Sequence, residues 1–270
     1  MEIVCRDITF RYQKDRSPIF SHLKARLELT GFNAVFGLSG SGKSTLAKLI
    51  SGLEPPQSGS IELAAAGQRA LLLYSWNGER IPCWQRIIDH FHSVTPEKSY
   101  GLLDELTDQF GLTDLMLSRF SRLSMGQKNR VNLVRYLVQD SDLLILDEVL
   151  ANVDEPMRHH ILGFIKQRFP EKNILYIAHS AAEVAAYAKR IFILPQASEG
   201  GTSRLMETSG LDLSALDGEG GRAAGPEDRA LQAELRQKSM EILALASSPA
   251  LFHGQGENHG SSEAREGFIG

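Results

Sequence analysis

Cysteine and long apolar runs are both scarce in this chain. Its 270 residues include only Cys5 and Cys83, and neither belongs to a C-x-x-C pair. Two cysteines cannot build a disulfide framework, so we expect two reduced, buried thiols. No uninterrupted apolar stretch approaches the roughly 20 residues of a membrane-spanning helix, and the amino terminus lacks the layout of a secretory signal. These absences favour a cytosolic protein over a secreted or membrane-spanning one.

Dense positive charge is lacking too. Lys and Arg number 29 against 33 Asp and Glu, which gives a formal net charge of -4. Because phosphate backbones are bound by clustered cations, this balance argues against a nucleic-acid partner. The histidine pairs His90/His92 and His159/His160 have no carboxylate or thiol at ligand spacing, so solvent or packing roles are favoured over metal binding.

The most specific stretch is a glycine-rich loop. It consists of Gly37, Leu38, Ser39, Gly40, Ser41, Gly42, Lys43, Ser44 and Thr45. An apolar run at 33–36 precedes it and helical spacing at 46–50 follows, so the order strand, loop, helix of a P-loop is present. Its backbone N–H groups can surround phosphate oxygens. Lys43 is expected to reach the outer phosphates and Ser44 to bind Mg²⁺, which predicts a bound nucleotide together with Mg²⁺.

Apolar strands alternate with helical segments through most of the chain. Strands are expected at 3–10, 19–29, 33–36, 59–63, 71–74, 143–146, 174–178 and 191–194. Helices are expected at 46–50, 123–137, 156–169, 181–188 and 226–245, with helical spacing also at 84–122. This alternation predicts an α/β fold of the P-loop NTPase type, with a mostly parallel sheet and a strand-rich amino-terminal layer.

Composition divides the chain into three parts. We expect a core domain at 1–195 that contains a helical insert at about 84–135. Residues 196–246 form an extension with one helix that begins at Pro226. Glycine and polar residues dominate 247–270, which predicts a disordered tail.

A pair of acidic residues follows the most apolar strand. The run 143–146 places Asp147 at the carboxyl end of a buried strand, where ligands bind in open α/β sheets. There Asp147 can hold Mg²⁺ through water, and Glu148 can act as the general base that polarises a water for attack on the γ-phosphate. The alternative is two acidic residues that merely start a loop.

Residues 123–127, Leu-Ser-Met-Gly-Gln, resemble the L-S-G-G-Q signature of ATP-binding cassette (ABC) ATPases. The resemblance implies an antiparallel amino-terminal β layer, a helical subdomain and a head-to-tail dimer that sandwiches two ATP molecules. Ser124, Gly126 and Gln127 would then contact ATP held by the second copy. Met125 replaces the first glycine of the signature.

Other family positions fall in the same order. Tyr12 matches the aromatic residue that stacks on adenine, although it could be an ordinary strand-end tyrosine. His179 matches the switch histidine at the γ-phosphate, although a lone strand-end histidine is more often a satisfied core group. Residues 151–154 resemble the loop that communicates across the dimer. Asn77 stands where the family has a glutamine that senses Mg²⁺ or the attacking water, and it is one methylene shorter.

A finer resemblance links this chain to ATPase subunits of nitrate, sulfonate and taurine importers. It rests on residues 82–84, on 87–89, on the short insert and on the helix after Pro226. It implies an ATP hydrolase on the inner face of the cell membrane that drives a separate permease, with an external solute-binding protein. The alternatives are an export-type ABC ATPase, a soluble ABC ATPase acting on nucleic acid or a cytosolic complex, and a regulatory nucleotide-binding subunit with negligible turnover.

Overall fold

The computed structural model describes residues 1–13, 17–64, 70–80, 84–196, 202–213 and 226–248. Cys83 and residues 249–270 of the expected tail lie outside this description. Cys5 is a buried free thiol, as expected, and burial raises its pKa to about 11.

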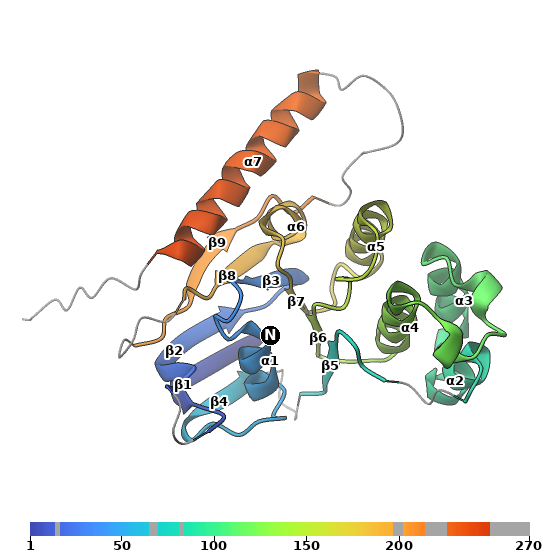
Figure 1. The fold of residues 1–270 in the computed structure, drawn as a ribbon, viewed down its shortest axis with the longest axis horizontal. Helices are drawn as coiled ribbons and strands as arrows, with labels where there is room; N and C mark the ends of the chain where they lie inside the picture. Colours follow the sequence, from blue (N-terminus) through green and yellow to red (C-terminus); the bar gives the residue numbers. More distant parts are fainter. Residues whose placement is uncertain (14–16, 65–69, 81–83, 197–201, 214–225, 249–270) are drawn as a thin grey trace, which may run out of the picture.

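A six-stranded sheet forms the centre of the molecule (Figure 1). In spatial order its strands are β5 (Leu72–Trp76), β6 (Leu143–Asp147), β7 (Ile174–Ile177), β3 (Phe32–Phe36), β8 (Arg190–Ile193) and β9 (Met206–Ser209). The first five are parallel, and β9 is antiparallel to β8. Every residue of β3, β6 and β7 is buried, which explains their continuous apolar sequences. The predicted parallel core is confirmed.

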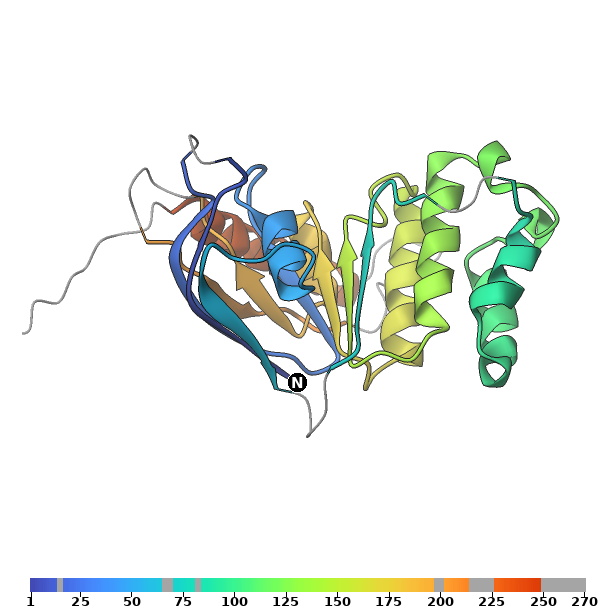
Figure 2. The same cartoon turned by 90° about the horizontal axis from the view of Figure 1, so that it is seen from below.

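A smaller antiparallel sheet carries the amino terminus. Its order is β2 (Phe20–Glu28), β1 (Glu2–Phe10) and β4 (Ser58–Ala64), so the expected edge strand at 59–63 is confirmed. Helix α1 (Lys43–Ile50) lies between this sheet and the central one (Figure 2). Its Leu46, Leu49 and Ile50 are buried in one apolar cluster with residues of both sheets. The helix that follows the glycine-rich loop is therefore held from two sides.

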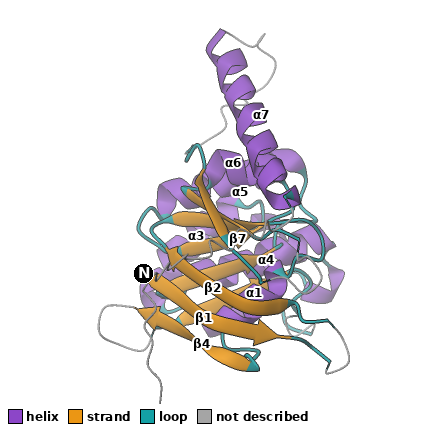
Figure 3. Cartoon of the chain, turned by 90° about the vertical axis from the view of Figure 1, so that its left-hand side faces the viewer, coloured by secondary structure: helices purple, strands orange, loops and turns teal. Residues whose placement is uncertain are grey.

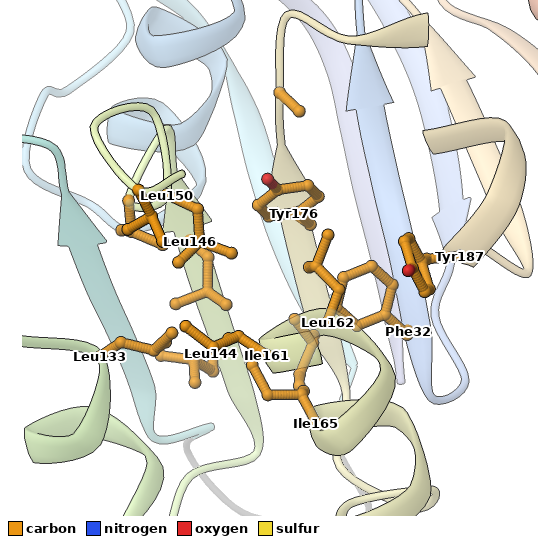
Figure 4. Close-up of a cluster of buried hydrophobic side chains, with 14 of the residues drawn as sticks. Phe32, Leu133, Leu144, Leu146, Leu150, Ile161, Leu162, Ile165, Tyr176 and Tyr187 are labelled. Atoms are coloured by element: carbon orange, nitrogen blue, oxygen red, sulfur yellow. The ribbon is translucent and has the colours of Figure 1, made fainter. Parts of the chain in front are cut away.

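The opposite face of the central sheet is covered by three helices, α4 (Met125–Leu137), α5 (Glu155–Arg168) and α6 (Ala181–Tyr187). Figure 4 shows Leu133 of α4 and Ile161 of α5 around Leu144 of β6. Beyond α4 lies the helical insert, at one end of the molecule (Figures 1 and 2). It contains α2 (Ile87–Val94), α3 (Tyr100–Gln109) and the 3₁₀ turns Glu97–Ser99, Thr113–Leu115 and Phe120–Arg122.

The extension adds one strand and one helix. The expected carboxy-terminal helix is present as α7 (Pro226–Ser247), which packs on α6 through its second half and projects away from the body (Figure 3). Strand β9 was not predicted, because its four residues alternate between half-buried and exposed and include no apolar run. The central sheet thus continues past residue 195. Within the described part of the chain, none of the helices combines the length and the apolar character that crossing a bilayer requires.

Replacing Leu144 with alanine tests the packing of the core. Leu144 is fully buried in β6, and such a truncation should lower the free energy of unfolding by about 2–5 kcal/mol. Leu117→Ala is the matched control, because Leu117 is 71% exposed and its loss should cost no more than about 0.5 kcal/mol. Urea unfolding followed by circular dichroism measures both. Equal effects of the two substitutions would contradict the placement of β6.

Candidate active site

The predicted site residues come from strands that run in parallel and end at the same edge. Strand β3 leads into the glycine-rich loop, β6 ends at Asp147, and His179 follows β7, which lies between them. Strand β5 lies on the other side of β6 and leads to Asn77. The topology therefore gathers four separate segments of the chain at one place.

The glycine-rich loop has a backbone that only glycine adopts without strain. Gly40 and Gly42 have φ angles of 81° and 97°, in the left-handed region. A Cβ atom on Gly42 would lie 2.7 Å from Ile19, and one on Gly37 would lie 2.5 Å from the Leu194 carbonyl oxygen. The loop is thus tightly fitted, and larger residues at these positions would displace it.

The start of helix α1 has no side-chain cap among the described residues. Gly42 occupies the cap position, and the first turn of the helix holds no acidic residue. The hydroxyl of Ser41 is buried without a hydrogen-bond partner among the described residues. Lys43 Nζ donates to the carbonyl oxygens of Gly37 and Leu38 at 3.0 and 3.3 Å, and burial lowers the pKa of this lysine. An anion at this helix start would satisfy the backbone donors and stabilise the charged lysine.

Asp147 accepts two hydrogen bonds at the end of β6. Ser44 Oγ donates to its Oδ1 at 3.1 Å, and the Tyr74 hydroxyl donates to its Oδ2 at 2.8 Å. Burial raises the pKa of Asp147, and burial followed by the Asp147 charge raises the pKa of Tyr74, so this hydroxyl remains a donor at neutral pH. Hydroxyl and carboxylate oxygens are the ligands that Mg²⁺ prefers, so Ser44 and Asp147 fit the predicted metal role.

Tyr74 was missed by the sequence analysis as a site residue. The available signal was a tyrosine inside a short, otherwise apolar strand, because a buried tyrosine hydroxyl needs a polar partner. Nothing in the sequence identified that partner as Asp147.

Glu148 and His179 are in direct contact. His179 Nε2 lies 2.5 Å from Glu148 Oε1, and both side chains are partly exposed. Glu148 has a φ of 56°, while its N–H donates to the Ile177 carbonyl oxygen at 3.0 Å. A left-handed glutamate costs about 1–3 kcal/mol and persists where the surroundings hold it, often at functional sites.

An open pocket of about 490 Å³ lies at this edge of the sheet. It is lined by Ser44, Lys48, Leu53, Tyr74, Trp76, Asn77, Asp147 and Glu148. The ring of Tyr12 is nearby, with its hydroxyl 3.3 Å from Thr45 Oγ1 and Lys48 Nζ 5.7 Å from the ring centroid. Tyr12 is 51% exposed, so about half of this side chain is open to solvent. The structure therefore brings Tyr12 to the start of α1.

The signature residues lie elsewhere. Ser124 and Gln127 form a capping box at the start of α4, with Gln127 N 3.2 Å from Ser124 Oγ and Ser124 N 2.8 Å from Gln127 Oε1. Met125 is 47% exposed, so its side chain does not fill the core. A Cβ on Gly126 would lie 2.4 Å from the Asn152 carbonyl oxygen, which makes glycine necessary there. Ser124, Gly126 and Gln127 are not among the residues that line the pocket beside α1.

Comparison with known proteins decides the family. A family profile described as "ABC transporter" matches residues 20–151. The aliphatic sulfonates import ATP-binding protein SsuB of Albidiferax ferrireducens is 32% identical over 238 residues, which cover 85% of this chain and 84% of that protein. The chain belongs to the ABC transporter ATP-binding family. The resemblance drawn from the P-loop and the signature is confirmed, as is the importer-type likeness.

Other relatives of this ABC family member differ in length or in sequence. The molybdenum import ATP-binding protein ModC of Vibrio cholerae is 32% identical over 211 residues, and the matched part spans 70% of this chain but 56% of that relative. Two solved structures share the fold. A bacterial Atm1-family ABC exporter with ATP bound has a TM-score of 0.66 at 24% identity, with 86% of this chain and 42% of the exporter chain covered. An inward-facing metal-chelate type ABC transporter has a TM-score of 0.59 at 21% identity, with 77% of this chain and 82% of that transporter chain covered.

Asn77, which the sequence resemblance aligns with a glutamine of the family, has partners that the sequence did not suggest. Its N–H donates to the Asp147 carbonyl oxygen at 2.9 Å. Its side-chain oxygen accepts hydrogen bonds from the amides of Asn129 and Asn152, both at 3.0 Å. Asn77 lines the pocket, but its Oδ1 atom is engaged with these two side chains.

Lys43→Ala should weaken ATP binding by about 100-fold, because it would remove the charge-assisted hydrogen bonds that Lys43 is expected to donate to the phosphates. Titration with ATP by isothermal calorimetry measures the effect. Lys98→Ala is the control, since Lys98 is an exposed lysine paired with Asp140 and its removal should leave the affinity unchanged. Tight ATP binding by Lys43→Ala would contradict the assignment of the phosphate site.

Proposed function

We propose that this chain is the ATP-binding and ATP-hydrolysing subunit of an ABC transporter. The observation that carries the proposal is the Ser44–Asp147 hydrogen bond beside a helix start with no side-chain cap. It joins a phosphate-binding loop to an acidic strand end, the two parts that a nucleoside triphosphatase needs.

The residues divide the work of hydrolysis. Lys43 and the N–H groups of the loop hold the phosphates, and Tyr12 stacks on the adenine. Ser44 and Asp147 would hold Mg²⁺, which would supply positive charge that offsets the negative charge on the phosphate oxygens. Glu148 takes a proton from the attacking water while the water oxygen forms a bond to the γ-phosphorus. The bond between the γ-phosphorus and the ADP oxygen breaks in the same step. His179 holds the Glu148 carboxylate in place through the 2.5 Å contact.

The second half of each site comes from another copy of the chain. The start of α4, which carries the signature, lies away from the chain's own pocket. In a head-to-tail dimer this helix start faces the nucleotide of the partner and offers its N–H groups to the γ-phosphate. Two ATP molecules are thereby enclosed, and their hydrolysis reopens the dimer.

Relatives of this chain are named for the import of aliphatic sulfonates and of molybdenum. By extension, we place this chain in an importer of a small organic or inorganic anion, on the inner face of the cell membrane. It acts with a separate integral membrane permease and an external solute-binding protein. Trp84 and Leu117 both belong to the insert region, and each is 71% exposed. They offer an apolar surface to a helix of the permease.

Glu148→Gln should leave ATP binding intact and stop turnover, because the amide cannot take up the proton. ATP then accumulates between two copies, and size-exclusion chromatography should show an ATP-dependent dimer. Glu171→Gln, at an exposed turn, is the matched control and should hydrolyse ATP as the parent does. Undiminished hydrolysis by Glu148→Gln, or a strictly monomeric ATP-loaded form, would refute this mechanism.

Affinity purification from membranes solubilised in mild detergent tests the transport role. We expect an integral membrane protein to be recovered with the tagged chain, and Trp84→Ala to reduce that recovery by removing apolar contact area. Leu243→Ala on α7, also exposed but distant from the insert, serves as the control. Recovery of soluble partners alone would instead support an ABC ATPase that acts on a cytosolic complex.

A further inference from the structure

Three asparagines meet where β5, α4 and the loop after Glu148 come together. Asn77 follows β5, Asn129 lies in the second turn of α4, and Asn152 lies four residues after Glu148. Asn77 Oδ1 accepts from Asn129 Nδ2 and from Asn152 Nδ2, each at 3.0 Å. Asn129 is only 2% exposed. We call these three residues the asparagine joint.

In the asparagine joint, the side-chain oxygen of Asn77, the atom that would bind a metal ion, already accepts two hydrogen bonds. An amide oxygen has two lone pairs, and two donors already occupy the oxygen of Asn77. Turning this oxygen toward Mg²⁺ would break both hydrogen bonds and leave the buried amide of Asn129 without its acceptor, which is costly. The arrangement therefore fits a cross-link better than a metal ligand.

The joint lies between the two functional parts of the chain. Asn129 belongs to the helix that starts at the signature, and Gly126 of that helix touches the carbonyl of Asn152 so closely that no Cβ fits. Asn77 is tied through its N–H to the Asp147 carbonyl oxygen, next to Glu148. One turn along α4 from Asn129, Asn132 Nδ2 donates to the Glu79 carbonyl oxygen at 2.9 Å. The segment after β5 is thus bonded to α4 at two successive points.

We infer that the asparagine joint positions the signature helix relative to Glu148 of the same subunit, and that Asn77 acts through this joint instead of binding Mg²⁺. The inference rests on the proposed function, because the signature of one copy serves the nucleotide of the other. When the partner's ATP draws the signature into place, the joint moves the loop that carries Glu148 with it. Closing one site then sets the base of the other.

Dimer formation without metal separates the two roles of Asn77. In a Glu148→Gln background with EDTA, Asn77→Ala, Asn129→Ala and Asn152→Ala should each raise the ATP concentration for half-maximal dimerisation by about 3- to 10-fold, as expected for one or two lost hydrogen bonds. The Asn77→Ala/Asn129→Ala double variant should need no more ATP for half-maximal dimerisation than the more strongly affected of the two single variants. Both substitutions remove the same Asn129–Asn77 hydrogen bond, so their effects should not add. Analytical ultracentrifugation measures the dimer. Normal dimerisation of all three single variants would overturn the inference.

A Mg²⁺ titration of ATP hydrolysis in the full-length chain provides the second readout. Asn77→Ala and Asn129→Ala should lower kcat by similar factors and leave the half-saturating Mg²⁺ concentration within about 2-fold of the parent value, since neither removes Ser44 or Asp147. If the half-saturating Mg²⁺ concentration rises by 10-fold or more for Asn77→Ala and not for Asn129→Ala, Asn77 is a metal ligand and the inference is overturned.

Matched controls exclude a general loss of structure. Asn173→Ala also removes a side-chain amide, which donates to the Asp142 carbonyl oxygen. Because this contact lies at the amino-terminal ends of β6 and β7, away from the asparagine joint, the variant should dimerise like the Glu148→Gln chain. Asn77→Asp keeps two acceptor oxygens and should restore dimerisation in EDTA relative to Asn77→Ala. If Asn129→Ala fails to fold, the exposed Asn152→Ala still carries the test. A parent chain without ATPase activity would overturn the proposed function together with the inference. If the parent chain is active and Asn77→Ala raises the half-saturating Mg²⁺ concentration by 10-fold or more, the inference alone is overturned.

Discussion

The parallel pairing of β3, β7 and β6 is the constraint on which the site depends. Parallel strands have their carboxyl ends at the same edge, so a loop after β3, an acid at the end of β6 and a histidine after β7 must come close together. The 3.1 Å hydrogen bond between Ser44 and Asp147, residues 103 positions apart, is the direct result. A change of order or direction of any of these strands would separate the phosphate loop from the acidic pair, however well each formed locally.

The sequence was most informative where a function is carried by adjacent residues. The P-loop, the Asp147–Glu148 pair and the signature each need a short run of particular residues, so they could be recognised and their elements placed. It was least informative where partners are distant. The Tyr74–Asp147 contact spans 73 positions, and the bonds from Asn77 span 52 and 75. An edge strand such as β9, with alternating half-buried residues, gives no apolar run that could predict it.

Buried charges at this edge do not stabilise the isolated chain. Burial lowers the pKa of Lys43 and raises that of Asp147, which means that the folded environment disfavours the charged form of both groups. A bound anion near Lys43 and a bound cation near Asp147 would reverse both effects. Because a ligand that binds only the folded state adds to its stability, nucleotide and metal should repay the energy that these two residues cost the fold.

The separation of the signature from the P-loop has a mechanical consequence. In the proposed head-to-tail dimer, each copy supplies its glycine-rich loop to one nucleotide and its signature to the other, so connections inside one chain would link the two sites. The tight contact of Gly126 with the Asn152 carbonyl is such a connection, because it leaves no space into which α4 could slide without moving the loop after Glu148. Rigid packing of this kind transmits a displacement of the helix instead of absorbing it. Gly126 and Asn152 therefore constrain one another's position, whether or not nucleotide is bound.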